Sequence, residues 1–82
     1  MLENIPEDFE FVSLPNQILR INPNEVDQIT VTGFGRVLLE NTKSGGYIAL
    51  NMRREQRYME YYKGSEEFKE ILLEAYRHVV LG

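Results

Sequence analysis

The C-terminal residues carry the clearest pattern of apolar and polar positions in the chain. Apolar side chains recur there at intervals of three and four residues, the period of an α-helix that buries one face. These side chains are Phe68, Ile71, Leu72, Ala75, Tyr76, Val79 and Val80. Ser65 precedes them as a capping residue, and Glu66 and Glu67 add negative charge to the first turn, where the helix dipole favours it. We expect an amphipathic helix over about 65–81.

The residues before this helix show shorter periods that are typical of β-strands. We expect short strands at 9–12, 18–21, a β-branched segment ending at Gly33, 36–40 and 47–50. The loop over 41–46 contains Asn, Thr, Lys, Ser and two glycines, and glycine supplies the positive φ that a tight reversal needs. The pattern therefore predicts an antiparallel meander from about residue 26 to residue 51.

Residues 51–64 allow two interpretations. A helix capped by Asn51 would place two methionines and a tyrosine on one side, but polar residues at 55–56 interrupt that stripe. The aromatic content of the segment is typical of a strand. We favour a strand over about 57–63, after a charged turn.

Together these segments predict one α+β domain over residues 1–82. A small antiparallel sheet of about four to six short strands, mainly within 9–63, would pack against the C-terminal amphipathic helix. This order of elements resembles that of pleckstrin-homology-like modules, a likeness that covers element order and no motif.

Composition narrows the sources of stability. A chain of 82 residues buries only about 60–65% of the surface that it exposes when unfolded. The chain has no Cys, which excludes disulfides and thiolate zinc sites. Apolar burial must therefore supply nearly all of the stability, and self-association would add to it.

Charge is distributed unevenly along the chain. The formal net charge is -4, but residues 31–63 hold six bases against three acids, whereas residues 1–30 hold six acids against one base. The middle of the chain is thus basic between two acidic ends, which allows two faces of different charge. The overall acidity argues against a protein that coats nucleic acid by bulk charge.

The basic middle contains an arginine and tyrosine cluster that is the candidate binding site. Its members are Arg53, Arg54, Arg57, Tyr58, Tyr61, Tyr62 and Lys63. Arginine binds carboxylates and phosphates through paired donors, and tyrosine is enriched at protein interfaces and stacks on bases. In the alternative interpretation, the tyrosines pack against the terminal helix and the arginines are solvated or pair with Glu55, Glu60 and the acidic N-terminal residues.

No pattern in the sequence indicates catalysis, a cofactor or a metal. Gly33-x-Gly35 lacks the third glycine of a dinucleotide loop, because Leu38 stands in its place, and it predicts a turn. Glu70, Glu74 and His78 are spaced four apart, but a single histidine makes a solvated pair the better interpretation than a metal site. We therefore expect a protein that is not an enzyme.

These observations favour a small regulatory module that acts by binding a protein partner or a second copy of itself. The alternative is a nucleic-acid-binding module that uses the same cluster. Acids in the first 11 residues and the lack of an apolar run of about 20 residues predict a soluble cytoplasmic protein without a membrane partner.

Overall fold

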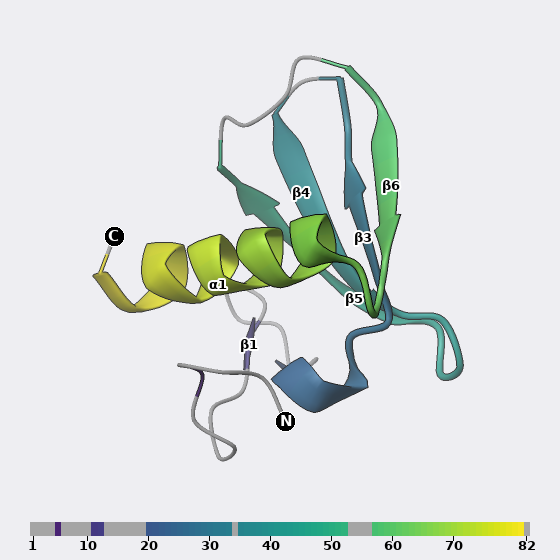
Figure 1. Ribbon diagram of the computed structural model, residues 1–82. Helices are drawn as coiled ribbons and strands as arrows, with labels where there is room; N and C mark the ends of the chain where they lie inside the picture. The colour runs from purple at the N-terminus through teal and green to yellow at the C-terminus, as the bar shows by residue number, and fades with distance from the viewer. Residues whose placement is uncertain (1–4, 6–10, 13–19, 34, 53–56, 82) are drawn as a thin grey trace.

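A four-stranded antiparallel sheet crossed by one helix dominates the fold (Figure 1). The computed structural model describes residues 5, 11–12, 20–33, 35–52 and 57–81. The sheet contains β3 (Gln28–Val31), β4 (Arg36–Asn41), β5 (Gly46–Asn51) and β6 (Met59–Tyr62), and α1 (Glu66–Leu81) follows. A separate pair, β1 (Phe11–Val12) and β2 (Arg20–Ile21), precedes the 3-10 turn η1 (Pro23–Glu25). The predicted α+β class and C-terminal helix are confirmed.

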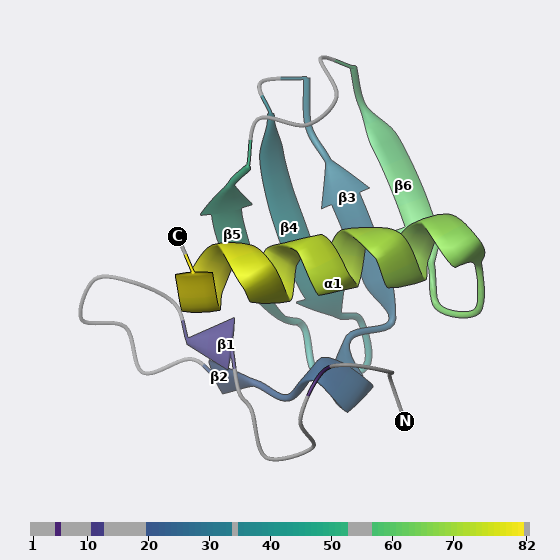
Figure 2. The same cartoon turned by 60° about the vertical axis from the view of Figure 1, so that its left-hand side comes forward.

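The strand order in the sheet is β5-β4-β3-β6, with every neighbouring pair antiparallel (Figure 2). The strands β3, β4 and β5 form the predicted meander. The chain then returns to the opposite edge of the sheet, where β6 pairs with β3. Ile29 of β3 lies between Leu39 of β4 and Tyr61 of β6. The strand favoured at 57–63 is thus present as β6, and it forms an edge of the sheet.

Residues alternate between the two faces of the sheet, and α1 covers only one of them. The buried side chains of the covered face are Ile29, Val31, Val37, Leu39 and Ile48. They share a core with Phe68, Ile71, Leu72 and Ala75 of α1, and with Ile5 and Val26. Apolar residues at helical period and apolar residues at strand period therefore bury one another, as the sequence pattern predicts.

Local hydrogen bonds explain where the elements begin and turn. The Ser65 hydroxyl accepts the Phe68 N–H at 3.2 Å and caps α1. Gly45 has a φ of 81° in the hairpin between β4 and β5, and Gly64 has a φ of 109° in the turn before α1. Gly35 donates its N–H to the Thr32 carbonyl at 3.2 Å, which confirms a turn at the Gly33-x-Gly35 motif.

One feature of the predicted helix differs from expectation. The apolar stripe predicted that Val79 would be buried, but this side chain is 41% exposed. The helix continues past the β5 edge of the four-stranded sheet (Figures 1 and 2), so its last turn lies beyond the strands of that sheet. Periodicity predicts which side of a helix is apolar, whereas the width of the sheet decides how much of that side is covered.

Candidate interaction surface

The face of the sheet opposite α1 is not covered by any described helix or strand (Figures 1 and 2). We call it the open face. Its strand residues are Gln28, Thr30, Arg36, Leu38, Glu40, Tyr47, Ala49, Asn51, Glu60 and Tyr62. In register, one row runs across all four strands from Tyr47 through Glu40 and Gln28 to Tyr62. This row therefore carries a tyrosine at each edge of the sheet, with Glu40 and Gln28 between them.

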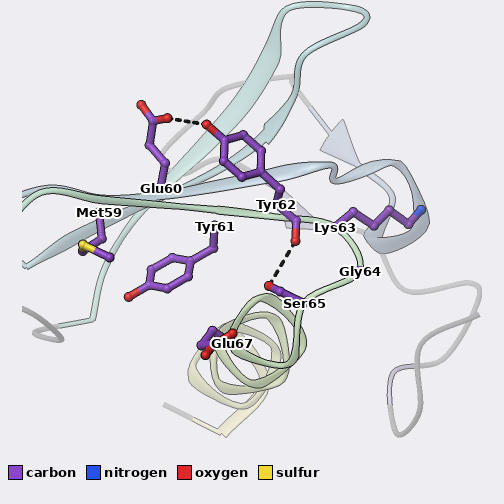
Figure 3. A pocket seen from close by; sticks show the side chains of 8 residues that line it. All are labelled: Met59, Glu60, Tyr61, Tyr62, Lys63, Gly64, Ser65 and Glu67. Carbon is purple, nitrogen blue, oxygen red and sulfur yellow. Dashed lines mark hydrogen bonds between the residues drawn. The ribbon is translucent and has the colours of Figure 1, made fainter.

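Three side chains of the β6 segment form a hydrogen-bonded group on this face. The hydroxyls of Tyr58 and Tyr62 each donate to a different carboxylate oxygen of Glu60, the Tyr62 bond measuring 2.5 Å. We call these three residues the tyrosine–glutamate cluster; Figure 3 shows Tyr62 beside Glu60. The tyrosines remain 60% and 55% exposed, so their rings are available for contact.

The hydrogen bonds of the cluster fix its charge state. The bond from Tyr58, and then the bond from Tyr62, lowers the pKa of Glu60 below its ordinary value. The bond to Glu60 raises the pKa of both Tyr58 and Tyr62 above their ordinary value. At neutral pH the cluster therefore presents one carboxylate held between two neutral phenols. Such a site suits an ammonium or guanidinium group, which pairs with the carboxylate and lies against the aromatic rings.

A second polar network lies on the strands next to the cluster. The Thr30 hydroxyl donates to Glu40 at 2.6 Å and accepts a hydrogen bond from the Gln28 amide at 3.4 Å. Thr30 is only 5% exposed, so this hydroxyl needs its partners. Among the described strand residues of this face, Arg36 is basic, whereas Glu40 and Glu60 are acidic. The described strands thus place two acids and one base on the open face.

The predicted binding residues separate into several environments. Tyr58 and Tyr62 share the open face, whereas Tyr61 points to the covered face and packs half-buried against the core. Lys63 lies in the turn after β6, and its ammonium donates to the Asn24 carbonyl at 2.8 Å. Arg57 is exposed before β6, and Arg53 and Arg54 lie outside the described residues.

Glu60 and Tyr47 are important residues of this surface that were not among the predicted binding residues. Glu60 is the centre of the cluster, and Tyr47 is 53% exposed at the far edge of the open face. The spacing of Tyr58, Glu60 and Tyr62 is a signal that could have identified the cluster, because alternate residues of a strand share one face. Tyr47 has no such local signal, since its place follows from the pairing of β5 with β4.

The outer edge of β6 is a second part of the site. Lys63 donates its N–H to the Asp27 carbonyl at 3.0 Å, and β-ladder alternation then directs the Tyr61 amide toward β3. The N–H and C=O of Glu60 and the N–H of Tyr62 therefore point away from the sheet. The Tyr62 carbonyl accepts hydrogen bonds from the N–H and the hydroxyl of Ser65 at 3.3 and 3.2 Å. No described strand pairs with this edge.

A depression of about 770 Å³ follows the same edge. Its lining comes from β6, the turn after it and the start of α1: Met59, Glu60, Tyr61, Tyr62, Lys63, Gly64, Ser65 and Glu67. Figure 3 shows Met59 and Tyr61 pointing toward the α1 side, and Glu60 and Tyr62 pointing to the other. Both walls of the depression thus carry an acid, Glu60 on one side and Glu67 on the other.

Another carboxylate near this region has a structural role. Burial alone would raise the pKa of Asp27, but hydrogen bonds from the Thr42 N–H and hydroxyl, with the nearby charge of Lys43, lower it. These bonds measure 3.0 Å from the N–H and 2.8 Å from the hydroxyl. Asp27 therefore ties the start of β3 to the hairpin between β4 and β5.

Within the ranges that the structure describes, no three His, Asp or Glu side chains group closely enough to hold a metal ion. The same ranges contain no helix long and apolar enough to cross a membrane. No family model, curated protein or solved structure matches the chain. By its fold the chain is a small α+β domain in which no described helix or strand covers one face of the sheet.

Proposed function

We propose that this chain is a non-catalytic interaction module that binds a protein partner through the β6 side of its open face. The observation that carries the proposal is the tyrosine–glutamate cluster, in which two exposed tyrosines flank an ionised carboxylate. Tyrosine is among the residues that dominate binding energy at protein interfaces, since a rigid ring covers a large area at little entropic cost. The hydrogen bonds to Glu60 hold both rings in place before binding, which reduces that cost further.

The charge of the open face favours a protein over a nucleic acid. Exposed tyrosines are platforms for stacked bases, so a nucleic-acid role is the second candidate. A nucleic-acid site also needs basic residues that neutralise phosphates, and the acids Glu40 and Glu60 on this face oppose such binding. The net charge of -4 acts in the same direction.

The first experiment selects partners of the full chain from a phage-displayed peptide library. Selected peptides should bind the double variant Tyr58→Ala/Tyr62→Ala at least about tenfold more weakly, as for interface hot spots. The matched control is Tyr47→Ala, because Tyr47 has similar exposure on the same face but lies at the opposite edge. Equal losses in both variants, or a selection that yields no binders, would contradict the proposal.

The second experiment tests the nucleic-acid candidate directly. Binding of labelled single- and double-stranded oligonucleotides is followed by fluorescence anisotropy at about 50 and 200 mM salt. Affinity that depends on phosphate contacts falls steeply over this range. We expect no saturable binding at either salt concentration. Binding that is strong at low salt and is lost when Arg57 and Tyr58 are both substituted would favour the nucleic-acid role instead.

A further inference from the structure

The edge of β6 offers a strand-pairing site directly beside the tyrosine–glutamate cluster. Glu60 directs its N–H and its C=O outward, and Tyr62 directs its N–H outward. Exposed edges of this kind pair with extended segments of other chains, because the main-chain groups supply the hydrogen bonds. The Ser65 bonds to the Tyr62 carbonyl close the ladder at that end. The open length is therefore short and centred on Glu60.

The faces of β6 specify the side chains of an added strand. An antiparallel segment would place one residue directly opposite Glu60, with its side chain on the open face and Cβ atoms about 5 Å apart. The residues on either side of it would point to the other face, toward Met59, Tyr61 and the depression. The geometry therefore favours an added strand in which one polar residue lies between two apolar residues.

The acidic side chains near the β6 edge favour a basic residue opposite Glu60. The carboxylate of Glu60 is ionised, and Glu67 places a second acid on the opposite wall of the depression. Lys63 is the base of this lining, but its ammonium is directed to the Asn24 carbonyl. A lysine or arginine opposite Glu60 would find a carboxylate between two rings, whereas an acid there would be repelled.

Resting on the proposed function, we infer that the partner is a basic extended segment that joins β6 as a fifth, antiparallel strand with lysine or arginine opposite Glu60. A second copy of this chain fits the edge less well. Symmetric pairing of two β6 strands about Glu60 would set two ionised carboxylates against each other, which destabilises a ladder. Two chains would also each bring a net charge of -4.

The test uses the full ¹⁵N-labelled chain and a blocked seven-residue peptide with a central lysine, valine on each side, and serine and threonine elsewhere. Titration followed by NMR should shift the amide signals of Glu60 and Tyr62 and slow their hydrogen exchange. Methylating the central peptide nitrogen should weaken binding at least about tenfold, because that N–H would donate to the Glu60 carbonyl. Methylating a neighbouring valine nitrogen should leave the affinity within about twofold, because that N–H points away from β6.

Charge reversal tests the choice of a basic residue. Glu60→Lys should lower the affinity for the lysine peptide about five- to thirtyfold, since an attractive cross-strand pair becomes a repulsive one. A peptide with a central glutamate should recover affinity for that variant. The control is Glu70→Lys, an exposed residue of α1, which changes the net charge equally and should leave affinity within about twofold.

Three results would overturn the inference: equal effects of the two methylated peptides, equal effects of the two charge reversals, or a concentration-dependent dimer whose formation shifts the Glu60 amide. The last result would assign the edge to a second copy. If the designed peptides fail but library-selected binders still depend on Tyr58 and Tyr62, strand addition is wrong and the proposed function stands. If no peptide of either kind binds, both are wrong.

Discussion

Adjacent leucines of β4 provide a direct test of which face of the sheet is buried. Leu39 has no exposed surface and lies between Ile29 and Ile48 under α1. Leu38 is half-buried on the open face, between Thr30 and Ala49. The two positions share residue type, strand and backbone environment, so Leu39→Ala and Leu38→Ala differ mainly in the face that they alter.

The expected costs differ severalfold. Truncating a fully buried leucine costs about 2.7–5 kcal/mol, because transfer free energy and a residual cavity both count. Full burial of a leucine contributes about 1.5–3 kcal/mol, so Leu38→Ala should cost about 1 kcal/mol. A domain of 82 residues is stable by about 4–12 kcal/mol in total. Leu39→Ala should therefore remove a large share of the stability, whereas Leu38→Ala should leave the domain folded.

Urea unfolding followed by far-ultraviolet circular dichroism measures both variants. With a slope of about 1 kcal/mol per M for a small domain, the midpoint should fall by about 1 M for Leu38→Ala and about 3 M or more for Leu39→Ala. Equal shifts, or a larger shift for Leu38→Ala, would show that the helix does not cover the face assigned to it. The open face would then no longer be a candidate interaction surface.

Three further outcomes follow from named contacts. Glu60→Gln should lower the pKa of Tyr58 and Tyr62 toward the ordinary value, because their charged acceptor is lost; an unchanged ultraviolet titration of the tyrosines would contradict the cluster. Asp27 has a lowered pKa, so it stabilises the fold above its ordinary pKa of about 3.9, and that contribution is lost as the pH falls through the lowered value. In the Asp27→Asn variant, the urea midpoint should therefore depend less on pH in this window than it does in the parent chain. An equal dependence on pH in both proteins would refute the stabilising role of Asp27. Ser65→Ala should cost about 1 kcal/mol in urea unfolding through loss of the α1 cap, whereas Ser65→Asp should retain most of it; equal losses would exclude capping.

Local patterns in the sequence predicted the elements better than their pairing. The stripe from Phe68 to Ala75 and the Ser65 cap specify α1, because helical contacts lie within a few residues of each other. The pairing of β6 with β3 could not be predicted in the same way. Nothing within 59–62 distinguishes β3 from β5 as a partner, since the choice depends on how the whole chain closes the core.

The sequence predicted which types of residue lie at the candidate site, but only partly which face of the sheet each one occupies. The concentration of tyrosines identified Tyr58 and Tyr62, but treating the cluster as one patch joined them to Tyr61, which a strand must place on the other face. In the alternative interpretation of the sequence, Glu60 is one of several acids that could pair with the arginines, whereas in the structure both of its oxygens accept tyrosine hydroxyls. A count of residue types cannot show this, because facing and hydrogen bonding depend on the strand period and on neighbouring strands.

Amide hydrogen exchange along β6 of the free chain measures whether this edge is open to a partner, as the addition of a strand beside Glu60 requires. We predict slow exchange for the amides of Met59 and Tyr61, which bond to β3, and fast exchange for the amides of Glu60 and Tyr62, which point outward. Protection of Glu60 as strong as that of Tyr61 would contradict the account, since the edge would then already be paired in the free protein.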